Sequence, residues 1–256
     1  MNNLCVAHRG FSYKAPENTI VAIKMAMAES FVQWVEIDTQ LSMDGIPVVI
    51  HDFTLNRTTN GKGLVKDYTW AQLQQLDAGS WKGRAFQGER IPSLDDVLKL
   101  SCGRLRLNIE LKTKGDMYPG LEQAVMEQIL YHHMENEVVL TSFDTDALRR
   151  VKELNSNFKT GLIIDARPQD LLERLKDLEC SFLSIGASHL DSTLDSTLVA
   201  QGITVMAWTI DDAKGMKRLA SVNSEIMICT NRPDVWGETF MDSKPSFWHW
   251  KLIKKD

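Results

Sequence analysis

The sequence predicts an α/β protein folded as a closed (β/α)8 TIM barrel, with a small insertion after a β-hairpin extension of the second strand. Three observations support this class. Apolar strand-like runs alternate with helical patterns along most of the 256 residues. Eight of these runs are each followed by a helical pattern, and eight units close a barrel. No G-x-G-x-x-G follows the first strand, which removes the commonest signature of the competing open, doubly wound sheet.

Composition and charge limit the class of partner. The chain is 43% hydrophobic and 25% charged, which suffices for a sizeable buried core, and no clean linker divides it. We therefore expect a single domain over residues 1–256, with the small insertion at about 53–90. The net charge of −5 and the sequence pI of about 5.7 argue against nucleic acid or an anionic membrane as the main partner.

Cysteine spacing and apolar run length indicate the compartment. The four cysteines are widely spaced and include no C-x-x-C pair, so we expect free thiols in a reducing environment. The first apolar run, residues 4–7, is too short for a signal-peptide core, and no run approaches the roughly 18 residues of a membrane span. We expect a cytoplasmic protein without stable membrane association. Its oligomeric state stays open, with a homodimer as one option.

The first two elements are a strand and a capped helix. The apolar run over 4–7 is the first strand, and it ends in His8-Arg9. After a loop, Asn18 is placed to cap a helix over about 19–29, where apolar residues recur at helical spacing. This strand and helix form the first of the eight units.

The second strand carries a hairpin. It runs over 34–40 and is followed by the turn dipeptide Asp44-Gly45 and a second apolar run over 47–50. This connection is too short for a parallel crossover, so the second run should pair antiparallel with the strand. If Asp44-Gly45 supplies both loop residues, counting back sets Asp38 opposite His51, roughly 5 Å away.

The segment from 53 to 88 has the weakest periodicity in the chain. Thr69 and Gln72 have the form of a capping box before a short helix over about 70–76. Long irregular segments in compact domains are usually functional covers or disordered linkers. The aromatic residues in this segment favour an ordered cover: Trp70, Trp81 and Phe86.

From residue 93 onward, helices and strands alternate with little ambiguity. Ser93 and Asp96 start a helix that ends near residue 100. The remaining strands are expected at 105–111, 137–142, 160–165, 182–185, 203–209 and 225–230. The helices that follow them are expected at about 121–134, 146–154, 169–178, 194–200, 212–220 and 234–241. The aromatic and basic tail from Pro245 is expected to dock against the barrel.

Charged residues interrupt the apolar strands at their C-terminal ends. His8 and Arg9 close the first strand, and Glu110 and Lys112 close the third. Glu36 and Asp38 lie late in the second strand, two residues apart and therefore on one face. Trp208 closes the seventh strand, and the hairpin returns His51 toward the same rim. In a parallel barrel these ends meet where barrel enzymes hold their active sites.

Clustered acids and histidines of this kind suit metal-assisted chemistry on a phosphate ester. Three converging carboxylates repel one another unless a cation holds them, and oxygen ligands favour Mg²⁺, Mn²⁺ or Ca²⁺ over zinc. Two imidazoles suit a general base and a general acid, and Arg9 and Lys112 add positive charge for a phosphate. Taken singly, each residue could be structural, for example as a buried pair of Glu36 with Arg9. Convergence of seven on one rim argues against that reading.

This set of residues resembles the H-R…E-x-D…H-D signature of glycerophosphodiester phosphodiesterases, in His8-Arg9, Glu36-x-Asp38 and His51-Asp52. The supporting matches run in order over about residues 4–235: 15–19 (APENT), 44–49 (DGIPVV), 57–59 (RTT), 91–94 (IPSL), 109–112 (IELK), 208–209 (WT) and 230–233 (TNRP). The resemblance is to the cytosolic bacterial type. It implies a TIM barrel that hydrolyses glycerophosphodiesters to sn-glycerol 3-phosphate and an alcohol.

The resemblance also implies a role for each site residue. Glu36, Asp38 and Glu110 would bind one divalent cation, Mg²⁺ or Ca²⁺ with Mn²⁺ as a further option. Arg9 and Lys112 would hold phosphate, and Trp208 would form a wall of the substrate site or of the core. The family often has a glycine near Ser30-Phe31 and an asparagine at Asp211, and neither departure is expected to touch the site.

Our hypothesis gives each histidine a role in the mechanism. His8 removes a proton from the nucleophile, and His51 protonates the leaving alkoxide. In one route the glycerol 2-hydroxyl attacks first and gives a cyclic phosphate that water then opens. The predicted neighbour Asp38 would raise the pKa of His51, which suits an acid.

Two other functions stay open. A phospholipase C or D type on the same barrel would act on lipid or lysolipid, and it would need an exposed apolar patch near the rim, for which Trp70, Trp81 and Phe86 are candidates. A non-catalytic binder of phosphate metabolites is the other. Intact His8 and His51 argue against a binder, which could lose both without penalty.

Overall fold

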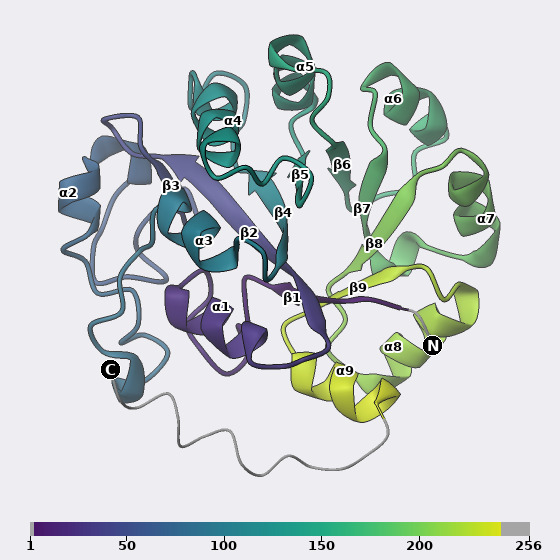
Figure 1. Ribbon diagram of the computed structural model, residues 1–256, viewed down its shortest axis with the longest axis horizontal. Helices are drawn as coiled ribbons and strands as arrows, with labels where there is room; N and C mark the ends of the chain where they lie inside the picture. Colours follow the sequence, from purple (N-terminus) through teal and green to yellow (C-terminus); the bar gives the residue numbers. More distant parts are fainter. Residues whose placement is uncertain (1–2, 242–256) are drawn as a thin grey trace.

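The computed structural model describes residues 3–241 and is a closed barrel of parallel strands surrounded by helices (Figure 1). Its sheet order is β1-β9-β8-β7-β6-β5-β4-β2-β3, and an additional β1–β2 pairing closes the ring. Among the described residues every pairing of these strands is parallel except β2 with β3, so eight parallel strands form a TIM barrel, as predicted. The strands are β1 Cys5–His8, β2 Val32–Leu41, β3 Pro47–Val49, β4 Arg106–Leu111, β5 Val138–Ser142, β6 Thr160–Ile164, β7 Phe182–Gly186, β8 Thr204–Trp208 and β9 Met227–Thr230.

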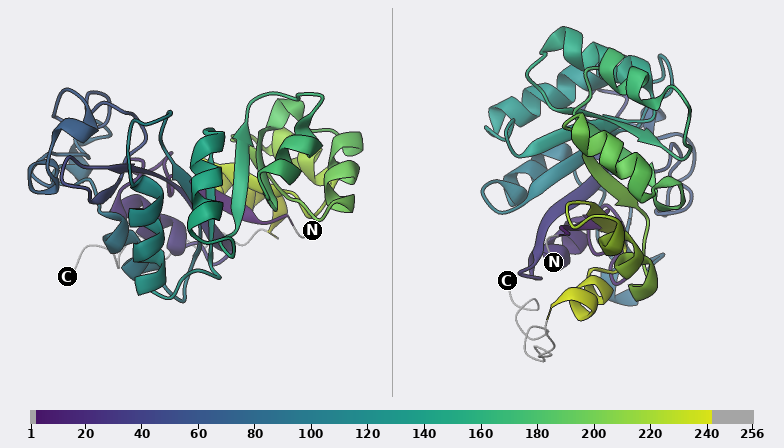
Figure 2. Two further views of the ribbon diagram at one scale, coloured as in Figure 1. Left: turned by 90° about the horizontal axis from the view of Figure 1, so that it is seen from above. Right: turned by 90° about the vertical axis from the view of Figure 1, so that its right-hand side faces the viewer.

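Helices connect the strands around the outside of the barrel (Figures 1 and 2). Capping boxes start α2 at Thr69 and α3 at Ser93, as predicted. The prediction that Asn18 caps the first helix is wrong: Thr19 is the cap, because Asn18 has a φ of +58° and its side chain turns toward the barrel. The helices are α1 Ile20–Met27, α2 Trp70–Leu73, α3 Leu94–Ser101, α4 Leu121–Tyr131, α5 Thr145–Leu154, α6 Leu171–Asp177, α7 Ser192–Ala200, α8 Ala213–Val222 and α9 Pro233–Phe240.

Successive residues along each barrel strand point alternately outward and inward, into two separate apolar clusters. Outward-facing residues such as Ala7, Ile37 and Ile109 belong to the main cluster beneath the helices. Inward-facing residues such as Val6 and Met206 form a separate cluster inside the barrel. Further along the same inward-facing positions, β1, β2 and β4 carry polar residues instead: His8, Glu36, Asp38, Asn108 and Glu110. The period of two therefore gathers polar side chains at the C-terminal mouth of the barrel.

The hairpin between β2 and β3 is antiparallel, as predicted, but its register differs by one residue. The turn has three loop residues, 43–45, because Gly45 adopts the left-handed conformation at a φ of +79° and adds a residue to the turn. The pairing therefore sets Asp38 opposite Ile50, whose N–H donates to the Asp38 carbonyl at 3.0 Å. The predicted pairing of Asp38 with His51 is wrong, and His51 lies just beyond the paired strand.

The insertion after the hairpin is folded around a small core of its own, which agrees with an ordered cover. It lies at one end of the molecule, beyond β3, in Figures 1 and 2. Helix α2 and two short 3-10 helices, Val65–Asp67 and Arg84–Phe86, belong to it. Its core joins residues of β3 and of the insertion: Val48, Ile50, Leu55, Val65, Leu73, Ala78 and Ile91. The insertion is thereby anchored to the hairpin that carries His51.

The helices of the barrel and the C-terminal tail bear on membrane association and on docking. Among the helices of residues 3–241, none combines the length and the apolar character needed to cross a bilayer. The tail from Pro245, which we expect to dock against the barrel, lies outside the described residues.

Candidate functional site

Three acidic side chains meet inside the mouth of the barrel. Glu36 and Asp38 come from β2 and Glu110 from β4, where Asp38 and Glu110 are neighbours in the sheet. One carboxylate oxygen from each lies within 4.8 Å of the other two. All three residues are buried, at 4%, 0% and 7% exposure respectively. The structure thus brings together the three residues predicted as metal ligands.

Two cations face this acidic cluster. Arg9 Nε lies 3.1 Å from Asp38 Oδ2, and Lys112 Nζ lies 2.7 Å from Glu110 Oε1 and 3.3 Å from Asp38 Oδ1. Burial acts to raise the pKa of Asp38, but the charges of Lys112 and Arg9 lower it below its usual value. Burial and the charge of Asp38 raise the pKa of Glu36 well above its usual value and that of Glu110 to about 7. The cluster is therefore short of positive charge.

His8 ends β1 and lies beside this cluster, with its Nε2 3.7 Å from Glu36 Oε2. Its Nδ1 lies 2.7 Å from Asn231 Oδ1. The Asn231 amide is oriented because its Nδ2 donates to Asp211 Oδ2 at 2.7 Å, so Oδ1 faces His8 as an acceptor. We therefore assign the His8 proton to Nδ1 and a free lone pair to Nε2. Burial and the charge of Arg9 lower the pKa of His8 to about 4, so the ring is neutral near pH 7.

Asp211 contacts no predicted site residue, as expected, but it holds the Asn231 amide that contacts His8. Asp211 Oδ1 accepts from the Thr230 hydroxyl at 3.0 Å and from the Asn231 backbone N–H at 2.8 Å. Only Asn231 separates Asp211 from His8. Asn231 and His8 are far apart in the sequence and meet where β9 pairs with β1.

His51 reaches the site from the loop after β3. Its Nδ1 lies 2.6 Å from Asp52 Oδ1, and it lines the same cavity as His8. Asp38 acts to raise the pKa of His51, as predicted, but the net direction is the opposite. Burial has the largest effect and, with the charges of Lys112 and Arg9, lowers the pKa of His51 below its usual value.

Three further polar residues contact the predicted ones, and a fourth, Arg57, joins them through Glu17. Asn18 donates from Nδ2 to Asp38 Oδ2 at 2.8 Å, and Asn231 orients His8. Glu17 accepts from Arg9 Nη1 at 2.8 Å, and Arg57 contacts Glu17. All four stand in the sequence segments that support the family resemblance, at 15–19, 57–59 and 230–233. That position was the only signal in the sequence, because helix and strand periodicity does not predict side-chain contacts between separate loops.

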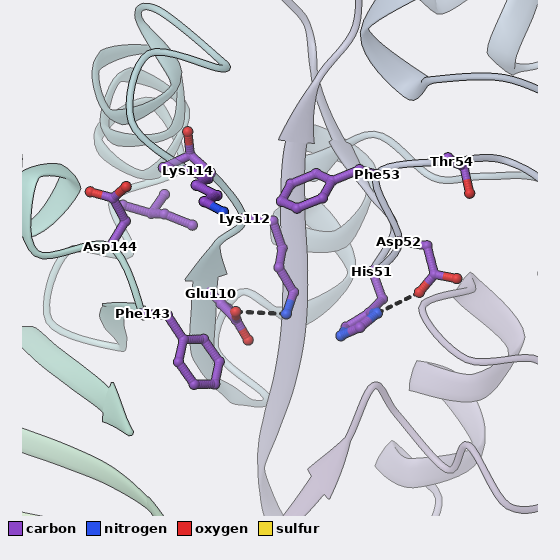
Figure 3. A pocket seen from close by; sticks show the side chains of 11 residues that line it. His51, Asp52, Phe53, Thr54, Glu110, Lys112, Lys114, Phe143 and Asp144 are labelled. Carbon is purple, nitrogen blue, oxygen red and sulfur yellow. Dashed lines mark hydrogen bonds and ion pairs between the residues drawn. The ribbon is translucent and has the colours of Figure 1, made fainter. Parts of the chain in front are cut away.

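Two adjoining cavities open at this mouth. The smaller, of about 110 Å³, is lined among others by His8, Arg9 and Trp208. The larger, of about 680 Å³, extends past Phe53 to Phe143, as Figure 3 shows. The indole Nε1 of Trp208 is buried without a hydrogen-bond partner in the part of the chain that the structure describes, which leaves a donor for a ligand. Four residues line both cavities: His51, Glu110, Lys112 and Phe143.

Comparisons with known proteins agree with this geometry. The model of the glycerophosphoryl diester phosphodiesterase family matches residues 8–235. The chain is 36% identical over 235 residues to a glycerophosphodiester phosphodiesterase of Caldanaerobacter subterraneus subsp. tengcongensis, covering 91% of this chain and 96% of that protein. It is 30% identical to a glycerophosphodiester phosphodiesterase of Bacillus subtilis, covering 91% and 85%. An Oleispira antarctica phosphodiesterase, solved in complex with the product sn-glycerol 3-phosphate, superposes with a TM-score of 0.87 at 35% identity, covering 92% and 96%.

Proposed function

The chain belongs to the glycerophosphodiester phosphodiesterase family, and we propose that it uses a divalent cation, with His8 and His51 as base and acid, to release sn-glycerol 3-phosphate and an alcohol. The observation that carries this proposal is the position of two histidines beside one buried acidic cluster, at the junction of two cavities. The product complex of the similar Oleispira antarctica enzyme supports sn-glycerol 3-phosphate as the common product.

The acidic cluster fits a hard divalent cation. Its ligands are carboxylate oxygens, which suit Mg²⁺, Ca²⁺ or Mn²⁺. Asp38 Oδ1 is buried and accepts no hydrogen bond from the described residues, although Lys112 Nζ is 3.3 Å away. The raised pKa values of Glu36 and Glu110, caused by burial and mutual repulsion, indicate that more positive charge would be accommodated. A cation bound by Glu36, Asp38 and Glu110 supplies charge that stabilises the phosphoryl oxygens as they become more negative.

His8 supplies the base. Its pKa of about 4, set by burial and by Arg9, keeps the ring neutral at pH 7. The hydrogen bond to Asn231 keeps the proton on Nδ1, so the Nε2 lone pair is available in the smaller cavity. There it can take a proton from the glycerol 2-hydroxyl or from water.

His51 supplies the acid. Because it lines both cavities, the phosphodiester can occupy the smaller one while the leaving alcohol extends into the larger. The Asp52 carboxylate, 2.6 Å from Nδ1, stabilises the imidazolium and leaves Nε2 to protonate the alkoxide. The charges of Lys112 and Arg9 make that proton more acidic, since they lower the pKa of His51 alongside burial.

Arg9, Lys112 and Trp208 bind the substrate. Burial acts to lower the pKa values of Arg9 and Lys112, but the neighbouring carboxylates, with Asp38 first among them, together raise both, so both side chains remain cationic. Both line the smaller cavity and can hold phosphoryl oxygens. The free indole N–H of Trp208 can donate to a glycerol hydroxyl.

The test is release of sn-glycerol 3-phosphate from a panel of glycerophosphodiesters with Mg²⁺, Ca²⁺, Mn²⁺ or EDTA. We expect release with a divalent cation and none with EDTA. Faster hydrolysis of a lysolipid than of glycerophosphocholine would instead favour the phospholipase type. Absence of product with every cation would overturn the proposal and favour a binder of phosphate metabolites.

A further inference from the structure

Arg57, at the start of the insertion, joins two carboxylates from separate parts of the chain. Its Nε and Nη2 donate to Asp52 Oδ2 and Oδ1 at 2.7 and 2.9 Å. Its Nη1 and Nη2 donate to Glu17 Oε2 and Oε1 at 2.8 Å each. The two bidentate contacts use the planar geometry of the guanidinium, and an ammonium could not reproduce them.

Both carboxylates lead on to the proposed site. Glu17 Oε1 also accepts from Arg9 Nη1 at 2.8 Å, and Asp52 Oδ1 meets His51 Nδ1 at 2.6 Å. A continuous chain of contacts therefore runs from Arg9 through Glu17, Arg57 and Asp52 to His51. None of the residues in this chain of contacts is one of the three acidic residues of the cluster.

The imidazole of His51 depends on this chain because little else holds it. Its backbone lies beyond the end of β3, where Gln40 Nε2 donates to the carbonyls of Ile50, His51 and Asp52 at 2.9, 3.0 and 2.9 Å. These contacts fix the peptide but not the ring. Among the described residues, the ring makes one hydrogen bond, to Asp52, and Figure 3 shows that pair at the side of the larger cavity.

The charges in this chain are balanced and persistent. Hydrogen bonds from Arg57 lower the pKa of Asp52 to about 2. Burial acts to raise the pKa of Glu17, but the hydrogen bond from Arg57 and the charge of Arg9 bring it below its usual value. Both carboxylates therefore stay ionised near neutral pH. Partly exposed ion pairs contribute little to stability, so we expect these contacts to matter for the orientation of the side chains more than for the free energy of unfolding.

We propose that Arg57 is a positioning residue for His51: it holds the Asp52 carboxylate so that the imidazole keeps its Nδ1–H on Asp52 and presents Nε2 to the leaving alkoxide. This inference rests on the proposed function of His51 as the acid. Its consequence is that Arg57 matters only when the departing alcohol needs a proton. Alkoxides need one, whereas p-nitrophenolate is stable enough to leave unprotonated.

The experiment compares two substrates that share the glycerophosphoryl group, glycerophosphocholine and the p-nitrophenyl ester of glycerol 3-phosphate. For Arg57→Gln we expect kcat on glycerophosphocholine to fall about tenfold or more, with KM nearly unchanged and kcat on the p-nitrophenyl ester within about threefold of the parent. Arg57→Lys keeps the charge but loses the paired hydrogen bonds, and we expect it not to restore kcat.

Arg167→Gln is the matched control, because Arg167 pairs with Asp191 outside both cavities and is 42% exposed, against 43% for Arg57. It should leave both substrates unaffected. Equal losses on both substrates in Arg57→Gln, or full activity in Arg57→Lys, would overturn the positioning role while leaving the proposed function intact. A parent protein inactive on both substrates would overturn the two together.

Discussion

The Nδ1 atom of His8 lies 2.7 Å from the Oδ1 atom of Asn231, a residue 223 positions away in the sequence. The two side chains meet where the first and last strands of the barrel pair. Because Asp211 fixes the Asn231 amide, this contact determines which nitrogen of His8 carries the proton. Orientation of the proposed base therefore depends on a residue outside the histidine and acidic motifs.

Asn231→Ala should lower kcat by about tenfold with a smaller effect on KM, because His8 can then adopt the other tautomer and turn. Steady-state kinetics on glycerophosphocholine measure this. Asn157→Ala, which removes an exposed amide between α5 and β6, is the control and should not alter kcat. Wild-type kcat in Asn231→Ala would show that this contact does not orient the base.

His8→Ala and His51→Ala should each lower kcat by about 100-fold or more, because in the proposed mechanism each removes a proton-transfer group. His189→Ala is the control: its imidazole also lies near an aspartate, 3.3 Å from Asp165, but it lines neither cavity. Near-native turnover in either active-site variant would refute the role assigned to that histidine.

Removal of metal should have a pH-dependent effect on thermal stability. The pKa of Glu110 is raised to about 7 by burial and by Asp38, so the folded protein binds this proton more tightly than the unfolded chain does. Stability of the metal-free protein should therefore fall as the pH rises from 6.5 to 8.5. Burial lowers the pKa values of His8 and His51, and these histidines act in the opposite direction near pH 6.5 because they still hold part of their protons in the unfolded chain. The pKa of Glu36, which burial and Asp38 raise well above its usual value, adds to the fall caused by Glu110.

Bound cation competes with the same protons, so Mg²⁺ or Ca²⁺ should raise the melting temperature more at pH 8.5 than at pH 6.5. Glu110→Gln should flatten the pH dependence of the metal-free protein and reduce the shift caused by the cation. Differential scanning fluorimetry with and without EDTA measures both quantities. A cation-induced shift of equal size at both pH values would contradict this account.

Phe143→Ala tests the larger cavity as the site of the leaving alcohol. The ring is 50% exposed and packs edge-on against Trp208, with centroids 6.0 Å apart. Its loss should lower kcat/KM by about fivefold for glycerophosphoinositol, because apolar contact with a large alcohol is lost, but not for the methyl diester. Leu154→Ala, at a site 52% exposed on α5, should change neither. Equal losses on both diesters would indicate general damage to the site.

Two glycines with positive φ should differ in their tolerance of alanine. At Gly45, with a φ of +79°, a Cβ would meet nothing within 4 Å, so Gly45→Ala should cost only the backbone strain of about 1 kcal/mol. At Gly10, with a φ of +78°, it would lie 2.6 Å from the backbone carbonyl carbon of Ala22, so Gly10→Ala should destabilise far more. Urea denaturation of the two variants gives the comparison, and equal midpoints would contradict it.

The parts of the site that lie on the barrel strands could be predicted from the sequence because strand periodicity is strict. An inward-facing position stays inward every second residue, so Glu36, Asp38 and Glu110 had to share the barrel interior once their strands were recognised. His8 follows from the same alternation in β1. To predict this polar layer above an apolar layer, only the strand boundaries have to be known.

Residues whose position depends on turn conformation could not be predicted in this way. One left-handed residue, Gly45, shifts the hairpin register by one and moves His51 off the strand. Asn18 also has a positive φ, which sends a residue suited to helix capping toward Asp38 instead. The contacts of Arg57 depend on the fold of the insertion, where no strong periodicity guides the prediction.

The closure of the ring by β1 and β9 has a consequence for biosynthesis. A nascent chain that has left the ribosome only as far as α4 already contains every carboxylate of the acidic cluster and both imidazoles. It lacks Asn231, and it lacks the strand against which β1 must settle. The contact by which Asn231 would orient His8 can therefore form only after β9 has been made, later than the carboxylates.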